Sequence, residues 1–360
     1  VYTSADHNLT AQLDYVRLLH KLAQNNIQVF AVLGNHDPLE AWKAKIPFPP
    51  NVHVFPTDAV ERVPLVVDGE EVAAIYGQSY AKSEQRDNLA WKFNRAAGDR
   101  FSIGMLHTQV GSRDSTYAPC TLEDLKECGM DYWALGHIHK HEILCEKPYV
   151  VYAGNPQGLD CTETGPRGCY YVEVGPYGTT DLEFIDTSIV RWESIDLAID
   201  GIESVSELRE SVRFAKEKVR RDIGKPTFLT VNFTGSGSMY HVLNNPEATQ
   251  YWLESWREEE QGKYAFVMVE RLRNLARPKM NMDERSKLPD SVGDYLNVFD
   301  KLEKLAPEEK AKALRDILMS RPEFERLGAY GRALTDQRLL ETFEKAKWLG
   351  VQKLLEHRRG

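Results

Sequence analysis

The chain has 360 residues, of which 45 are basic and 54 acidic, so its formal net charge is −9. This balance argues against a protein that coats nucleic acid indiscriminately, although it leaves room for a local phosphate-binding patch. No apolar run approaches the length of a membrane span and no signal peptide is visible, so the cytoplasm is the expected compartment.

The beginning of the chain alternates helical and extended patterns. Leucines from Leu9 to Leu22 recur at helical spacing and predict a helix. The apolar run 27–33 predicts a buried strand. Two further apolar runs, 63–67 and 72–76, flank Asp68-Gly69, a dipeptide that predicts a β-hairpin turn.

Further strand patterns complete a first domain. Runs 101–106 and 132–135 read as buried strands, and an approximate capping box at 121–124 predicts that a helix begins between them. More strand patterns crowd between Ile143 and Ile185. We therefore predict an α/β domain over 1–190, with two packed sheets flanked by helices.

Two other regions follow. A small α/β cap domain is predicted over 191–279, and a charged helical region over 280–360. The patterns behind the cap are helices at 205–221 and from Pro246, and strands at 228–233 and 266–269.

Short polar stretches follow several of the predicted strands. They are Gly-Asn-His-Asp at 34–37, His107, Gly-His-Ile-His at 136–139 and a related Gly-Asn-Pro turn at 154–156. Imidazole nitrogen with amide and carboxylate oxygen suits divalent ions such as Mn, Fe and Zn. In open α/β sheets, ligands bind beyond the carboxyl ends of strands, where these groups fall. The two His of 136–139 are two residues apart, so in an extended segment both would point the same way.

Simpler interpretations apply to individual residues. A single His, such as His107, is more often a hydrogen-bonded structural residue than a ligand, and only the ordered combination favours a metal site. The five cysteines lack Cys-x-x-Cys spacing and are interpreted as buried reduced thiols rather than a thiolate site. The histidines interpreted as flanking, surface or packing residues are His7, His20, His53, His141, His241 and His357.

The order and spacing of the motifs resemble the calcineurin-like metallophosphoesterases, and within them the SbcD-like DNA repair exonucleases of the YhaO type. Three further stretches point to that branch: residues 9–12, 153–158 and 165–169. The resemblance covers nearly the whole chain, with strong motifs in its first half. It implies a metal-dependent hydrolase that uses two divalent metal ions, and the expected metal is Mn²⁺.

The resemblance also implies roles for individual residues. Asn35, His107 and His137 would bind one metal, and His139 the other. His36 would protonate the leaving oxygen or stabilise the transition state.

Two further assignments are weaker. Asp37 would orient the His36 imidazole. Asn155 would hold a loop on the phosphate side and so take part in substrate binding, or it stands in a turn chosen for its backbone geometry.

This sequence departs from the family pattern at its start. Family members carry Asp-x-His and Gly-Asp ahead of these motifs, and here residue 1 is Val. Asp6-His7 is a poor substitute, because adjacent residues of a strand face opposite ways, and Asp6 reads better as a helix N-cap. We expect that the chain lacks an N-terminal segment and is impaired, whereas a version extended to an upstream start codon is active. Equal manganese-dependent activity of both would contradict this.

Two basic stretches are candidate contacts for a nucleic-acid backbone. The first, 213–225, is interspersed with acidic residues and is better explained as a solvated helix face. The second includes Arg271, Arg273 and Arg277, and the resemblance would place it against a duplex.

The main functional hypothesis is a manganese-dependent DNA exonuclease or endonuclease. One alternative is a phosphoesterase acting on a phosphoprotein, nucleotide or cyclic nucleotide, which would cleave bis-p-nitrophenyl phosphate but not DNA. Another is a non-catalytic scaffold that binds DNA or an ATPase without turnover. The resemblance implies a coiled-coil ATPase partner of the SbcC kind and allows a homodimer.

Overall fold

The computed structural model describes residues 9–38, 46–112, 114–178, 180–280, 282–325 and 334–356. The chain divides into two compact units, each built from several segments. One comprises Val1–Ser194, Val219–Thr230 and Glu260–Met268, and the other comprises Ile195–Lys218, Val231–Glu259 and Val269–Gly360. Residues 191–279 are thus shared between the two units.

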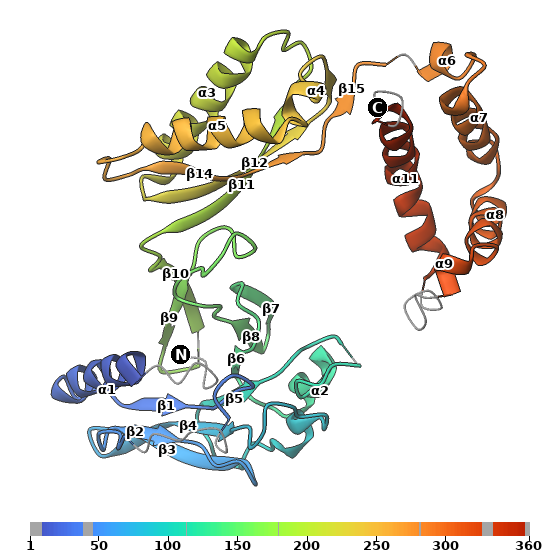
Figure 1. Ribbon diagram of the computed structural model, residues 1–360. Coiled ribbons are helices and arrows are strands. Elements are labelled where there is room, and N and C mark those ends of the chain that lie inside the picture. The colour runs from blue at the N-terminus through green and yellow to red at the C-terminus, as the bar shows by residue number, and fades with distance from the viewer. Residues whose placement is uncertain are drawn as a thin grey trace. The chain divides into compact units, whose positions relative to one another are not determined.

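A six-stranded sheet forms the centre of the first unit (Figure 1). Strands β4, β5, β6 and β8 are parallel, and β3 and β7 are antiparallel edge strands. His107 pairs with Gly136, and Leu135 with Tyr152, so the carboxyl ends of β5, β6 and β8 meet at one edge. In spatial order the strands are β3 (Glu61–Val67), β4 (Glu70–Gln78), β5 (Ser102–His107), β6 (Tyr132–Gly136), β8 (Tyr149–Tyr152) and β7 (Glu142–Glu146).

The predicted hairpin and capping box are both present. Asp68 and Gly69 have φ values of 52° and 84°, and this left-handed pair connects β3 to β4. Thr121 caps helix α2 (Leu122–Glu127), because its side chain accepts a hydrogen bond from the backbone N–H of Asp124, whose carboxylate accepts one from the Thr121 N–H.

Apolar layers cover both faces of this sheet. On one face Trp133 and Leu106 pack with residues around the short helix η3 (Leu89–Lys92) and α2. On the other face Tyr132 and Val151 pack against the hairpin of β9 (Gly168–Val174) and β10 (Thr180–Asp186). Successive residues of a strand point to opposite faces, which is why Tyr132 and Trp133 enter different layers. The predicted layered α/β fold is confirmed.

A smaller parallel pair joins β1 (Val29–Ala31) to β2 (Val52–Val54). Helix α1 (Leu9–Gln24) precedes it and buries Val16 and Leu19, as the leucine spacing predicts. A Cβ at Gly77 of β4 would lie 2.4 Å from the ring of Phe55, so only glycine allows the residue after β2 to pack this closely.

Asp99 carries a pH-dependent part of the stability. Burial opposes its charge, but hydrogen bonds from Arg62, Tyr76 and Ser102 outweigh burial and lower the pKa of Asp99. A carboxyl group whose pKa is lower in the folded than in the unfolded protein stabilises the fold at pH values above the unfolded pKa. This stabilisation is lost as the pH falls through the folded-state pKa. We therefore expect the free energy of unfolding, measured with urea, to fall less between pH 5 and pH 3 in Asp99→Asn than in wild type. The exposed control Asp181→Asn should keep the wild-type slope, and a wild-type slope in Asp99→Asn would contradict the prediction.

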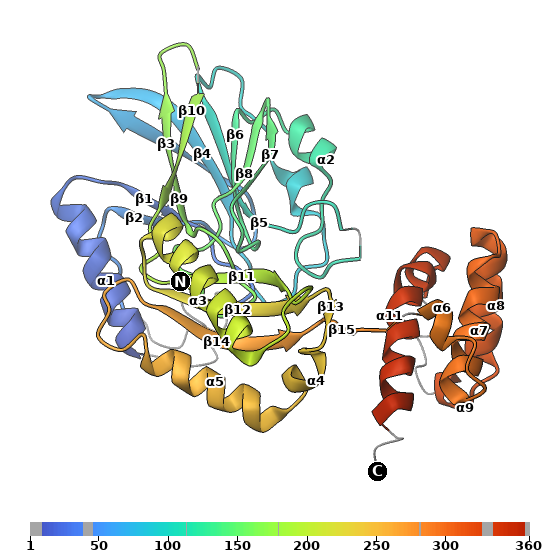
Figure 2. The same ribbon diagram turned by 90° about the horizontal axis from the view of Figure 1, so that it is seen from above.

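The region predicted as the cap holds a three-stranded sheet of order β11-β12-β14. Helices α3 and α5 lie on one side of its strands (Figures 1 and 2). Trp252 and Trp256 of α5 are buried, as is Phe233 of β12. The elements are β11 (Arg191–Ala198), α3 (Val205–Ile223), β12 (Thr227–Thr234), β13 (Ser236–Gly237), α4 (Tyr240–Leu243), α5 (Pro246–Glu258), β14 (Val267–Asn274) and β15 (Arg277–Pro278).

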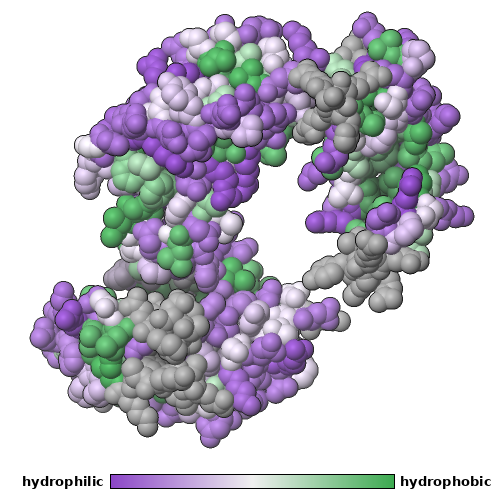
Figure 3. All heavy atoms as spheres, viewed as in Figure 1, coloured by the Kyte–Doolittle hydropathy of each residue, from purple (hydrophilic) through white to green (hydrophobic). Residues whose placement is uncertain are grey.

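Beyond β15 the described residues form helices joined by short connections. The helices share small cores, one of which contains Val292, Leu296 and Val351. Hydrophobic side chains also reach the surface of these helices (Figure 3), including Met319 and Leu349. Within the described ranges no helix is long and apolar enough to span a bilayer. The helices are α6 (Met282–Arg285), α7 (Ser291–Glu303), α8 (Pro307–Met319), α9 (Pro322–Glu325) and α11 (Asp336–Glu356).

Candidate metal centre

The turn that carries Asn35 is fixed by hydrogen bonds to the segment after β4. The Leu33 N–H donates to Ser79 Oγ at 3.0 Å, and the Tyr80 N–H donates to the Leu33 carbonyl at 3.0 Å. The Gly34 N–H donates to Asp37 Oδ1 at 2.9 Å and closes the turn. These bonds hold the chain after β1 beside the six-stranded sheet and present the Asn35 side chain to the end of β5.

His107 and Asn35 meet directly, although 72 positions separate them. The Nε2 atom of His107 lies 2.7 Å from the Oδ1 atom of Asn35. A Cβ at Gly34 would lie 2.4 Å from the His107 ring, so glycine is required for the ring to reach Asn35. Burial, followed by the neighbouring imidazoles of His137, His36 and His139, lowers the pKa of His107 to about 3. The ring is therefore neutral at physiological pH, the state in which imidazole binds metals.

His137 completes this cluster from the end of β6. Its ring centroid is 5.2 Å from that of His107 and 4.6 Å from that of Tyr117. Burial and the nearby His139 and His36 also lower the pKa of His137.

The expectation of an extended segment at 137–139 is wrong. Strand β6 ends at Gly136, and His137 adopts a φ of 104°, in the left-handed region that side chains rarely occupy. The chain bends there, so the two-residue spacing of His137 and His139 does not by itself place both rings on one side. Such strain is found preferentially at functional sites.

His139 has a partner that the sequence did not reveal. Its Nδ1 atom lies 2.5 Å from Oε1 of Glu163, whose other carboxylate oxygen accepts a hydrogen bond from Asn155 Nδ2 at 2.8 Å. Burial opposes the charge of Glu163, but hydrogen bonds from His139, the Leu159 N–H and Asn155 outweigh it and lower the pKa of this carboxyl.

Both polar side-chain atoms of Asn155 form hydrogen bonds in this network. Its Oδ1 accepts a hydrogen bond from Arg167 Nη1 at 3.3 Å, and Arg167 is 5% exposed. Its backbone N–H donates to the His139 carbonyl at 3.0 Å. The contacts of Asn155 are thus with the protein, and substrate binding by Asn155 stays a prediction.

His36 and Asp37 lie in the turn after β1. His36 is exposed, and its proximity contributes to the low pKa values of His107 and His137. Asp37 Oδ1 accepts the Gly34 N–H. The proposed orientation of the His36 ring by Asp37 stays a prediction.

The cluster offers part of a metal site. Two ligands of one cation with bonds of about 2.1 Å lie about 3 Å apart at a right angle, and the 2.7 Å between Asn35 Oδ1 and His107 Nε2 fits such a pair. Among the residues that the structure describes, no three His, Cys, Asp or Glu side chains form a metal-binding group.

Other predicted residues have ordinary environments. His141 stacks on Phe184 with ring centroids 3.8 Å apart, consistent with a flanking role. Cys120 and Cys128 are buried thiols, but Cys169 is exposed, so burial was a wrong expectation for the cysteines as a group. Of the other histidines, His7 and His357 lie outside the described residues.

Both basic stretches contain exposed arginines, among them Arg213 and Arg221 in the first, as expected of a solvated helix face. In α3, Lys216 is 2% exposed and its Nζ donates to the Trp256 carbonyl. On β14, Arg271 and Arg273 are both exposed and two residues apart, so they share a face of the strand. Arg277 lies over the Trp348 ring at 4.7 Å, a cation–π contact within its own unit.

Comparison with known proteins identifies the family. The sequence profile of calcineurin-like phosphoesterases matches residues 5–141, and that of the middle domain of metallophosphoesterase YhaO matches residues 192–277. The chain is 32% identical over 286 residues to the uncharacterized metallophosphoesterase YhaO of Bacillus subtilis, covering 78% of this chain and 69% of that protein. The chain belongs to the calcineurin-like metallophosphoesterases of the YhaO type.

A more distant similarity links this metallophosphoesterase to a named repair protein. The chain is 24% identical over 242 residues to the DNA double-strand break repair protein Mre11 of Methanocaldococcus jannaschii, and the match covers 59% of this chain and 61% of that protein. As a calcineurin-like metallophosphoesterase the chain is a hydrolase of phosphate esters, in a family that uses divalent metal ions. The first profile match includes all four predicted metal ligands, at positions 35, 107, 137 and 139.

Proposed function

We propose that this metallophosphoesterase hydrolyses phosphodiester bonds of DNA with Mn²⁺ as its metal, acting as an exonuclease or endonuclease. The observation that carries the proposal is the contact of Asn35 with His107, with the His137 ring beside them. Bound divalent cations would activate water and neutralise charge on the phosphoryl oxygens.

The residues of the chain have separate tasks in this proposal. Asn35, His107 and His137 hold one cation, and burial keeps the His107 imidazole neutral. His139 would bind the second metal ion. His36 is exposed on its turn and can approach a bound ester, where it would give a proton to the leaving oxygen.

The choice of DNA is supported by two observations. The name of the Mre11 relative describes a DNA double-strand break repair protein. In addition, Arg271 and Arg273 present two guanidinium groups on one face of β14, a suitable arrangement for phosphate contacts. The same proposal includes two partners, a coiled-coil ATPase and a second copy of the chain. It also includes a cytoplasmic location.

The test compares substrates. End-labelled linear DNA and bis-p-nitrophenyl phosphate are each incubated with Mn²⁺ and either the chain or its His36→Ala variant. Manganese-dependent DNA cleavage that His36→Ala reduces by about 100-fold or more would support the proposal. Cleavage of the small ester alone would favour another phosphoesterase, and metal-independent DNA binding without turnover would favour a scaffold.

The arginines of β14 give a separate prediction. If Arg271 and Arg273 contact phosphates, alanine at either position should weaken DNA binding uniformly across sequences and reduce the salt slope of log K by about 1. Fluorescence anisotropy at several salt concentrations measures that slope. Arg86→Ala is the control, because Arg86 is an exposed arginine paired with Glu84, as Arg271 is with Glu270, and it should leave the slope unchanged. A slope that stays at the wild-type value in Arg271→Ala and Arg273→Ala would contradict the prediction.

A further inference from the structure

The loop after β8 holds His139 at two points. The Glu163 carboxylate bonds to Nδ1 of the ring, and Arg167 Nη1 donates to the His139 backbone carbonyl at 2.5 Å. The side chain of Glu163 is 13% exposed, whereas that of His139 is 49% exposed. A ring that would otherwise rotate in solvent is thus fixed by a largely buried acid.

Glu163 is itself held in place by its neighbours. Its Oε2 atom accepts hydrogen bonds from Asn155 Nδ2 and from the Leu159 N–H, each at 2.8 Å. A Cβ at Gly154 would lie 2.7 Å from the His139 carbonyl oxygen, so glycine is needed for this loop to approach so closely. Both carboxylate oxygens are engaged, and the carboxylate has one orientation available.

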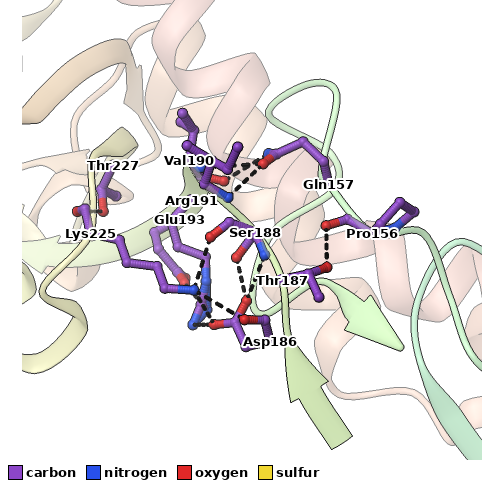
Figure 4. A network of polar contacts seen from close by, with 11 residues as sticks. Pro156, Gln157, Asp186, Thr187, Ser188, Val190, Arg191, Glu193, Lys225 and Thr227 are labelled. Atoms are coloured by element: carbon purple, nitrogen blue, oxygen red, sulfur yellow. Dashed lines mark hydrogen bonds and ion pairs between the residues drawn. The ribbon is translucent and has the colours of Figure 1, made fainter. Parts of the chain in front are cut away.

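The same loop is also anchored by the segment that follows β10 (Figure 4). Gln157 Oε1 accepts hydrogen bonds from the N–H groups of Ile189 and Val190 at 2.9 and 3.2 Å, and Thr187 Oγ1 donates to the Pro156 carbonyl. The segment after β10 therefore supports the loop that carries Glu163.

The hydrogen bond selects one tautomer of His139. A carboxylate only accepts hydrogen bonds, so Nδ1 must carry the proton in this contact, and the lone pair of Nε2 is left available. Metal-bound histidines generally donate their other ring N–H to a carboxylate or carbonyl in this way.

We propose that Glu163 is a positioning residue that holds the His139 ring in the Nδ1–H tautomer and aims its Nε2 atom at a divalent cation. This inference rests on the proposed function for the identity of the ligand, but the tautomer itself is a property of the metal-free protein. Asn155 and Arg167 support this role through their hydrogen bonds to Glu163 and to the His139 carbonyl.

The experiment uses the metal-free chain and three variants: Glu163→Ala, Glu163→Gln and, as a control on the exposed face of β10, Glu183→Gln. Two-bond ¹H–¹⁵N spectra of His139 report which ring nitrogen is protonated, and calorimetric titration with MnCl₂ reports affinity. We expect wild type and Glu183→Gln to show the Nδ1–H tautomer. Glu163→Ala should shift His139 toward the Nε2–H form and lose about 10- to 100-fold in Mn²⁺ affinity. Glu163→Gln, which keeps an acceptor without the charge, should lose less.

An Nδ1–H tautomer in Glu163→Ala would overturn the proposal, as would unchanged Mn²⁺ affinity. If Glu163→Ala does not fold, an Nε2–H form of His139 in wild type or an Mn²⁺ affinity of Glu163→Gln above that of wild type would overturn it. If wild type binds no Mn²⁺ but its tautomer depends on Glu163, the proposed function fails while the positioning role stands.

Discussion

Alanine in place of His107 is expected to lower Mn²⁺ affinity and phosphodiesterase activity by more than about 100-fold, beyond the loss typical for a residue that only supports a ligand. His107 is the centre of the cluster: its Nε2 lies 2.7 Å from Asn35 Oδ1 and its ring is adjacent to that of His137. Removing the imidazole would take away a predicted ligand and the hydrogen-bond partner of Asn35. Calorimetric titration with MnCl₂ and hydrolysis of bis-p-nitrophenyl phosphate measure the two effects.

The matched control for His107→Ala is His20→Ala, because His20 is exposed on α1. It should bind and hydrolyse as wild type does. Thermal unfolding of both variants without metal separates lost ligation from lost folding. Wild-type Mn²⁺ affinity in a folded His107→Ala protein would show that this cluster is not the metal site.

Alanine in place of Trp133 is expected to lower the free energy of unfolding by about 3–5 kcal/mol. Trp133 is fully buried, packs against Phe93 with ring centroids 5.0 Å apart, and donates its indole N–H to the Leu125 carbonyl at 3.0 Å. The variant leaves a large cavity and an unpaired buried carbonyl. A Cβ at Gly104 would lie 2.5 Å from the Trp133 ring, so the neighbouring strand is shaped around it. Urea unfolding measures the change.

Trp91→Ala is the control for Trp133→Ala. Trp91 is 74% exposed, although its indole N–H donates to Asp124 at 3.0 Å. Its removal should cost about 1 kcal/mol, the net value of one such hydrogen bond. Equal losses in the two variants would contradict the assignment of Trp133 to the core.

Features that depend on neighbouring residues were predictable from the sequence. The α1 helix, the hairpin turn at Asp68-Gly69 and the capping box at Thr121 are each specified within a few residues, and all are present. The placement of His107 at a strand end was also predictable, because an apolar run leads into it.

Features that depend on distant contacts were not predictable in this way. The bend at His137 arises from a left-handed backbone conformation of the histidine itself, and the sequence pattern does not predict that conformation there. Glu163 reaches His139 across 24 positions from a loop of irregular structure, and it resembles any other acidic residue in the sequence. Periodicity and motif spacing describe strands and ligands, but they say little about the groups that orient those ligands.

The most direct test of the metal centre is anomalous scattering from crystals of the chain soaked in MnCl₂. We predict a manganese peak about 2.1 Å from both Asn35 Oδ1 and His107 Nε2, with a nitrogen of His137 at a similar distance. Manganese bound elsewhere, with Asn35 and His107 still hydrogen-bonded to each other, would contradict the assignment of this cluster as the metal site.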